Sequence, residues 1–203
     1  AKLIVIDPRK TETVESAHCK ADVHLAIRPG TNVAILDSIA HVIVREKLYN
    51  EAFVRARCEV KEFENWMALV GDDKYAPELI GPIANVDPAD IRKVARMYAG
   101  GPNSTIYYGL GVTEHSQGST GVMCLGNLGL SCGMLGREGV GVNPLRGQGN
   151  VQGGSCLGSW PHVFSGYRFV TDYETRSSFE KEWGVPLDPE PGLRLPNMLD
   201  SAV

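Results

Sequence analysis

The sequence lacks an excess of positive charge, a long apolar run and closely paired cysteines, and each absence excludes a class of protein. Its 203 residues hold 20 lysines and arginines against 24 aspartates and glutamates, a formal net charge of -4. No basic surface therefore supplies affinity for nucleic acid. No stretch approaches about 18 consecutive apolar residues, the length of a bilayer-spanning helix, and no signal-peptide pattern opens the chain. We expect neither nucleic-acid binding nor insertion into a membrane.

No CxxC pair occurs among the five cysteines, which are Cys19, Cys58, Cys124, Cys132 and Cys156. The spacing of a zinc ribbon or of an iron–sulfur run is therefore missing, and we assign no metal ligand in this chain. An odd number of cysteines in a chain long enough to build a core favours a reducing compartment. We predict a cytoplasmic location and leave a periplasmic one open. Cys124 and Cys132, eight residues apart on a predicted helix, are expected to pack rather than to ligate.

Apolar runs of strand length alternate with helix-period patterns along the chain. Extended segments are predicted at residues 2–6, 23–27 and 104–108, and helices at 32–48, 51–70, 88 to about 100, 118–135 and 176–183. Such alternation predicts an α/β fold with a mainly parallel sheet flanked by helices. Seventeen of the 23 glycines lie between residues 100 and 158. The stretch after residue 136 is therefore predicted to be an irregular loop of functional type.

The carboxyl end of the first extended segment carries Asp7 and Arg9. Ligands of open α/β sheets bind beyond the strand ends, where an acidic residue often accepts hydrogen bonds from ribose hydroxyls. Arg9 is close enough in sequence to meet a phosphate or to stack on a base. The same residues also fit a plain turn aspartate beside a solvated arginine, so both interpretations stay open.

Two further segments stand where a ligand could meet the backbone. Asn32 is predicted to cap the helix at 32–48, and the free N–H groups of that helix start could also hold an anion. Residues 109–111, Gly-Leu-Gly, follow an extended segment and allow close approach of the backbone. Glu114 and His115 come next. No partner for acid–base chemistry is identifiable by spacing, so we predict that these two form a hydrogen-bonded structural pair.

Arg146 and Gln148 are embedded in an otherwise apolar, glycine-rich stretch. An arginine buried in such surroundings needs a carboxylate, a phosphate or another anion to satisfy its charge. Composition alone leaves two interpretations equally open: a substrate or cofactor contact, and a structural ion pair.

Four segments together resemble a known family. They are IVIDPRK near the start, then RPGTNVAIL, YGLGVTEH and GVNPLRGQGNVQGG, in that order. They are similar to the catalytic subunits of molybdenum- or tungsten-dependent formate dehydrogenases, which belong to the bis-molybdopterin guanine dinucleotide oxidoreductases. The resemblance extends from residue 2 to about residue 183. The NPxRGQ pattern points to the formate dehydrogenase branch of that family.

The resemblance implies roles for individual positions. The guanosine end of one pterin cofactor would be held by the DPR element and by the RPGTN loop, and the remaining positions would follow the dinucleotide. These cofactor-binding positions are Ile6, Asp7, Pro8, Arg9, Gly30, Asn32, Gly109, Leu110, Gly111, Glu114 and Gly147. Arg146 matches the arginine that faces formate, and Gln148 matches the neighbouring amide. A guanidinium can bind both oxygens of a small carboxylate and so orient its C–H bond.

The resemblance also implies a Rossmann-like dinucleotide-binding domain at residues 1–158 and, at 159–203, a connection towards the next domain. The cofactor would be molybdopterin guanine dinucleotide with molybdenum or tungsten. We expect the chain to be an interior part of a longer subunit. Its other segments would carry a 4Fe–4S cluster and a cysteine or selenocysteine ligand, and a separate subunit would take the electrons. The isolated piece is expected to be inactive.

Several positions depart from the common family pattern, among them Gly149, Ser155 and Cys156. Many relatives carry aspartate where this chain has Asn32, and the family commonly has glutamine where it has Glu114. Two rival functions are therefore kept. One is a different bis-pterin oxidoreductase, such as a nitrate reductase. The other is a nucleotide-binding module that uses Asp7, Arg9 and Asn32 for a guanine nucleotide and catalyses nothing.

Overall fold

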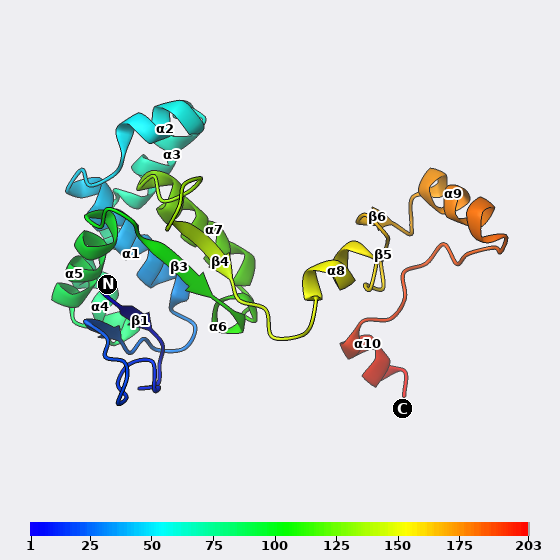
Figure 1. Ribbon diagram of the computed structural model, residues 1–203, viewed down its shortest axis with the longest axis horizontal. Helices are drawn as coiled ribbons and strands as arrows, with labels where there is room; N and C mark the ends of the chain where they lie inside the picture. The colour runs from blue at the N-terminus through cyan, green and yellow to red at the C-terminus, as the bar shows by residue number, and fades with distance from the viewer. Residues whose placement is uncertain (203) are drawn as a thin grey trace. The chain divides into compact units, whose positions relative to one another are not determined.

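The computed structural model describes residues 1–202, which form short strands and helices (Figure 1). The strands are β1 (Ile4–Ile6), β2 (Val23–Leu25), β3 (Thr105–Tyr108), β4 (Gly141–Pro144), β5 (Val163–Phe164) and β6 (Arg168–Phe169). The helices are α1 (Asn32–Arg45), α2 (Glu51–Arg57), α3 (Val60–Val70), α4 (Pro77–Ala84), α5 (Pro88–Ala99), α6 (Leu110–Thr113), α7 (Gly118–Ser131), α8 (Val151–Cys156), α9 (Tyr173–Trp183) and α10 (Leu195–Asp200), with a 3-10 turn η1 (Asp73–Tyr75). In the part of the chain described, no helix is both long and apolar enough to cross a bilayer.

The chain forms two compact units, unit 1 (Ala1–Leu145) and unit 2 (Arg146–Val203). The predicted division at residue 158 falls inside unit 2. The assignment of residues 1–158 to cofactor binding stays a prediction.

Unit 1 contains two parallel strand pairs. β1 pairs with β2, with Ile4 opposite Val23, and β3 pairs with β4, with Thr105 opposite Gly141. Parallel neighbours need a crossover connection, which for β3 and β4 runs through α6 and α7. The predicted α/β class with parallel pairing is confirmed. The strands are three or four residues long and form separate two-stranded sheets.

Helix α1 occupies the centre of unit 1 and packs against α3, α4, α5 and α7. Its apolar residues recur on more than one face, because neighbours surround it. Ile35, Val42 and Ile43 are fully buried. Burial of side chains of this kind stabilises the fold by about 1.5–3 kcal/mol each. α1 therefore contributes many of the side chains in the hydrophobic core of unit 1.

Helix α7 approaches β4 closely because glycine occupies the contact. A Cβ atom at Gly129 would lie 2.8 Å from Cγ2 of Val142. The small-residue face of this helix thus lets it lie directly on the strand. α7 ends at Ser131 rather than at the predicted residue 135, where a turn at Gly133, with φ +68°, takes over.

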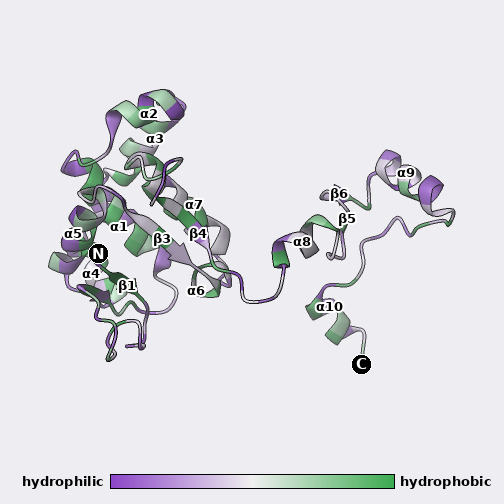
Figure 2. Ribbon diagram, in the orientation of Figure 1, coloured by the Kyte–Doolittle hydropathy of each residue, from purple (hydrophilic) through white to green (hydrophobic). Residues whose placement is uncertain are grey.

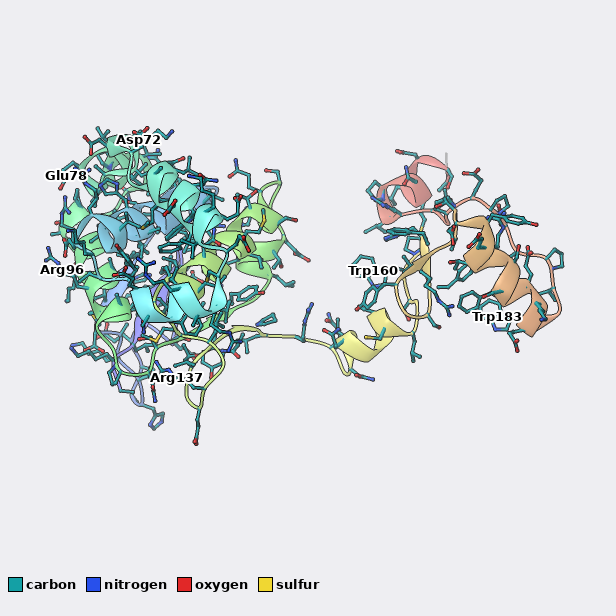
Figure 3. All side chains as sticks on the ribbon, turned by 90° about the horizontal axis from the view of Figure 1, so that it is seen from above. Asp72, Glu78, Arg96, Arg137, Trp160 and Trp183 are labelled. Atoms are coloured by element: carbon teal, nitrogen blue, oxygen red, sulfur yellow. The ribbon has the colours of Figure 1, made fainter. Side chains whose placement is uncertain are left out.

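Two carboxylates join α1, α4 and α5 at the surface of unit 1. Glu46 accepts hydrogen bonds from Nε and Nη2 of Arg96, both 2.8 Å long. Arg92 donates to both carboxylate oxygens of Glu78, at 2.7 and 2.8 Å, and its Nη1 lies 4.0 Å from Glu46. Glu78 and Arg96 lie on the surface of unit 1 in Figure 3. The bidentate pair of Arg96 with Glu46 fixes the end of α1 against α5, and Nη2 of Arg92, shared between both oxygens of Glu78, links α5 to α4.

Several predicted elements differ from those observed. The helix predicted at 51–70 is interrupted at Cys58, whose extended backbone separates α2 from α3. This break allows the ring of Phe63 to pack edge-on against Tyr49, with centroids 5.6 Å apart. The stretch after residue 136 is not wholly irregular, because pairing with β3 orders residues 141–144 as β4 and Asn150 caps α8. Helix α4 was not predicted.

A small aromatic cluster packs the elements of unit 2 together. The rings of Phe164 and Phe179 stack at 4.5 Å, and Trp183 meets Phe179 at 5.0 Å. The guanidinium of Arg168 lies 4.4 Å above the Phe179 ring. The hydropathy colouring of Figure 2 shows α9 as largely hydrophilic and α10 as largely hydrophobic. Only a few residues of α9, with Phe179 the buried one, hold it to the rest of unit 2.

We expect Ile43→Ala to lower the free energy of unfolding by about 2–5 kcal/mol, because it opens a cavity in a fully buried position. Urea unfolding followed by circular dichroism measures the change. Ile83→Ala removes the same atoms from a side chain that is 53% exposed, and its expected cost is less than about 1 kcal/mol. Equal costs for the two variants would contradict the assignment of α1 to the core.

The hydrogen bonds from Arg96 hold the pKa of Glu46 below its ordinary value of 4.5. A lowered pKa means that the stabilisation is complete above pH 4.5 and is lost as the pH falls through the lowered value. We expect Glu46→Gln to cost about 0.5–1 kcal/mol at pH 7, and we expect this cost to shrink steadily as the pH falls below 4.5 and through the lowered pKa. Chemical unfolding at several pH values tests this.

The control is Glu12→Gln, since Glu12 is exposed and forms no ion pair within residues 1–202. It should cost less than about 0.5 kcal/mol at every pH. A Glu46→Gln difference that does not shrink at all as the pH is lowered below 4.5 would argue against the ion pair as its cause.

Candidate functional site

The residues after β1 form a turn held by hydrogen bonds, and the Arg9 guanidinium beside it is unpaired within residues 1–202. The Asp7 amide donates to the Leu25 carbonyl at 3.2 Å, and Nε2 of His24 lies 2.8 Å from the Asp7 carbonyl oxygen. One carboxylate oxygen of Asp7 accepts from the Arg9 amide at 2.7 Å. The exposed Arg9 guanidinium makes no hydrogen bond or ion pair with any described residue. Pro8, between them, is exposed, and Ile6 is 39% exposed.

The turn after β2 leads directly into α1. The Arg28 amide donates to the Ala84 carbonyl at 2.8 Å, and the Thr31 hydroxyl donates to the Arg28 carbonyl at 2.6 Å. Gly30 has φ +90°, a left-handed conformation that favours glycine, and nothing lies within 4 Å of a Cβ built there. The chain is therefore open to solvent at this turn.

Thr31, not the predicted Asn32, is the N-cap of α1, and it makes no side-chain capping hydrogen bond. The amides of residues 32–34 have no acceptor in the described part of the chain. Free amides at the start of a 14-residue helix favour negative charge, because the peptide dipoles add along the axis. This agrees with the anion-holding interpretation of the segment.

Asn32 joins the turn after β2 to the segment after β3. Its Nδ2 donates to the Gly111 carbonyl at 3.2 Å, across 79 positions of sequence. Gly109 begins this segment, and Leu110 is 62% exposed. Beyond β4, the Leu145 amide donates to the Tyr108 carbonyl at 2.7 Å. The ends of β2, β3 and β4 therefore meet along one edge of unit 1.

Glu114 and His115 do not form the predicted pair. Nε2 of His115 lies 3.0 Å from the Gly111 carbonyl oxygen. The Glu114 side chain is exposed and makes no hydrogen bond or ion pair within residues 1–202. The prediction was right that His115 has a structural contact and wrong about its partner, which is a backbone carbonyl four residues earlier.

Arg146, Gly147 and Gln148 open unit 2, directly after Leu145. All three are exposed, and neither long side chain forms a hydrogen bond or ion pair among the residues described. Of the two interpretations left open, the structural ion pair of Arg146 is not formed within residues 1–202, and the contact with a substrate or cofactor stays a prediction. The Arg146 guanidinium is free to meet a ligand or another segment.

No three histidine, cysteine, aspartate or glutamate side chains within residues 1–202 are grouped so that they could hold a metal ion. Burial raises the pKa of the Cys124 thiol to about 12 and that of Cys132 to about 11. Both thiols therefore stay protonated at neutral pH and are poor metal ligands. Cys124 donates to Oδ1 of Asp37 at 3.4 Å, and burial raises the pKa of that carboxyl. The predicted packing role of both cysteines is confirmed.

Sequence reasoning did not select Arg28 as a site residue. Its exposed guanidinium is without a hydrogen bond or ion pair in the described chain. It follows β2 much as Arg9 follows β1, and the two strands are paired. Its place just before Pro29 and Gly30, at the end of an apolar run, was the available signal.

Residues 1–178 match the family model described as "Molybdopterin oxidoreductase". The chain belongs to the molybdopterin oxidoreductase family. Formate dehydrogenase H of Escherichia coli (strain K12) is 43% identical over 91% of this chain and 25% of that protein. The F420-dependent formate dehydrogenase subunit alpha of Methanocaldococcus jannaschii is 41% identical over 100% of this chain and 28% of that protein.

A nitrate reductase of Synechocystis is 32% identical over 95% of this chain and 26% of that protein. Among solved structures, acetylene hydratase from Pelobacter acetylenicus superposes with a TM-score of 0.59 at 29% identity, over 70% of this chain and 18% of that one. This molybdopterin oxidoreductase chain therefore shares its fold with that enzyme. It spans about a quarter of the length of the curated relatives named here.

Proposed function

We propose that this chain is part of the catalytic subunit of a formate dehydrogenase, which oxidises formate to carbon dioxide, a proton and two electrons. One observation carries the proposal. Four relatives named as formate dehydrogenases match 91–100% of the chain at 38–43% identity. The nitrate reductase stands lower, at 32%, as do two relatives named as putative formate dehydrogenases, at 31%. A nitrate reductase-like activity and a guanine nucleotide-binding module without catalysis are the alternatives that the experiments below separate from it.

The cofactor proposed is molybdopterin guanine dinucleotide carrying molybdenum or tungsten, and the strand-end residues have the chemistry to hold it. Asp7 has a carboxylate oxygen left for a ribose hydroxyl or a guanine N–H. The free guanidinium groups of Arg9 and Arg28 suit phosphate oxygens or the face of a base. Oδ1 of Asn32 stays available while its Nδ2 holds Gly111. Together these groups fit an anionic nucleotide.

The glycine positions suit close approach of the dinucleotide to the backbone. Nothing lies within 4 Å of a Cβ built at Gly111 or at Gly147, so their missing side chains are not explained by packing inside this chain. Leu110 offers an exposed apolar surface next to Gly111. The neighbouring Glu114 carboxylate repels an anion, and its exposure lets it turn towards water.

Arg146 is proposed to bind both oxygens of formate and to aim its C–H bond. Gln148, two residues on, offers an amide that can donate to the same carboxylate. Both side chains would orient the substrate, and the positive charge of Arg146 would offset the negative charge of formate. The metal–pterin group, when bound, supplies the acceptor for two electrons.

The remaining parts of the proposal concern the longer protein. Other segments of the same subunit would supply the protein ligand of the metal and a 4Fe–4S cluster, and an electron-transfer subunit would receive the electrons. A cytoplasmic location stays a prediction.

We expect Arg146→Lys in the full subunit to lower kcat/KM for formate by about 10–100-fold, because an ammonium group cannot make the paired contact of a guanidinium. Steady-state turnover of formate with an artificial electron acceptor measures this. Arg194→Lys, an exposed arginine of unit 2 outside the NPLRGQ segment, is the matched control and should leave turnover unchanged. Undiminished turnover in Arg146→Lys would remove Arg146 from the formate site.

We expect Gly111→Ala to leave folding intact but to speed loss of the pterin from the full subunit by about 5-fold or more, because the added methyl meets the cofactor rather than the protein. Gly126→Ala is the control, since this helical glycine also has nothing within 4 Å of a built Cβ. Both variants should change the free energy of unfolding by less than about 1 kcal/mol. Pterin fluorescence after gel filtration compares them, and equal retention would place the cofactor elsewhere.

A further inference from the structure

The Gly111 carbonyl lies within hydrogen-bond distance of two side chains at once. Nδ2 of Asn32, the first residue of α1, is 3.2 Å from the oxygen, and Nε2 of His115 is 3.0 Å from it. A carbonyl oxygen has two lone pairs and can only accept, so both nitrogens donate and His115 carries a proton on Nε2. One donor comes from four residues later and the other from 79 residues earlier.

The segment around Gly111 needs such contacts to keep one conformation. α6 has four residues, too few to be a stable helix on its own account. Val112 packs against the hydrophobic core of unit 1. Leu110 is 62% exposed, however, and a Cβ at Gly111 would touch nothing. Packing therefore holds the end of α6 and leaves its beginning to hydrogen bonds.

Holding the Gly111 oxygen also holds the turn that precedes it. The peptide unit is planar, so the Gly111 carbonyl and the Val112 N–H are fixed together. That N–H donates to the Gly109 carbonyl at 3.1 Å. The two side-chain donors thus set the orientation of the backbone from Gly109 to Val112.

We propose that His115 and Asn32 are positioning residues that jointly hold the Gly109–Gly111 backbone in the conformation that receives the dinucleotide. The inference rests on the proposed function for the identity of that ligand. The backbone contacts themselves are independent of it. Because both donors share one acceptor, either of them partly replaces the other.

The test uses the full subunit with His115→Ala, Asn32→Ala and the double variant. Hydrogen–deuterium exchange of the cofactor-free subunit reports on the amides of residues 109–113. We expect each single variant to speed their exchange by about 2–10-fold, and the double variant to exceed the product of the two. Cofactor retention, measured as guanosine monophosphate released by hydrolysis after dialysis, should fall most in the double variant.

Two conservative variants separate positioning from general destabilisation. The amide nitrogen of His115→Gln can reach the place of Nε2 and should restore both exchange and retention. His115→Asn places its amide near Nδ1 instead and should behave like His115→Ala. Equal behaviour of the glutamine and asparagine variants would overturn the proposal, as would unchanged exchange in the double variant.

The outcome for the wild type distinguishes this inference from the proposed function. A wild-type subunit that holds no pterin and no guanine nucleotide overturns the proposed function and the ligand named here with it. A loaded wild type whose double variant retains the cofactor equally well overturns only the positioning role.

Discussion

Helix α1 constrains the rest of unit 1, because it is packed against α3, α4, α5 and α7 at once. The helix cannot rotate about its axis without moving Ile35, Val42 or Ile43 out of their buried positions. The direction of its first turn is therefore fixed by the core. Asn32 stands at that first turn, so the core also fixes where its amide can donate. The geometry at the strand ends therefore depends on the packing of α1, although only the first turn of this helix reaches the strand ends.

This dependence joins segments that are distant in sequence. The turn after β2, the segment after β3 and the exit of β4 meet through the hydrogen bonds of Asn32 and Leu145. Their side chains use little of their hydrogen-bonding capacity on one another. Arg9 and Arg28 have exposed guanidinium groups, and Gly30 and Gly111 have open space where a side chain would be. A surface with fixed backbone and unused charge suits an anionic ligand, which agrees with membership of the molybdopterin oxidoreductase family.

Local sequence was sufficient where the interactions themselves are local. Asp87 accepts from the Ala89 amide at 2.8 Å and Pro88 follows it, so the start of α5 was predicted correctly from capping chemistry. The residues after β1 were likewise placed correctly at its carboxyl end. Interactions between distant residues were not predictable in this way. The break at Cys58 accompanies a contact between Phe63 and Tyr49. No local sequence pattern predicts this break.

The sequence by itself determined the α/β class, the parallel pairing and the family, because these rest on periodicity and on motifs that are read along the chain. The tertiary structure alone decided what several motif residues do. Thr31 rather than Asn32 caps α1, His115 contacts Gly111 rather than Glu114, and Arg146 is exposed rather than buried. These outcomes depend on which groups the folded chain brings within about 3 Å of a donor. Spacing along the sequence does not predict that distance.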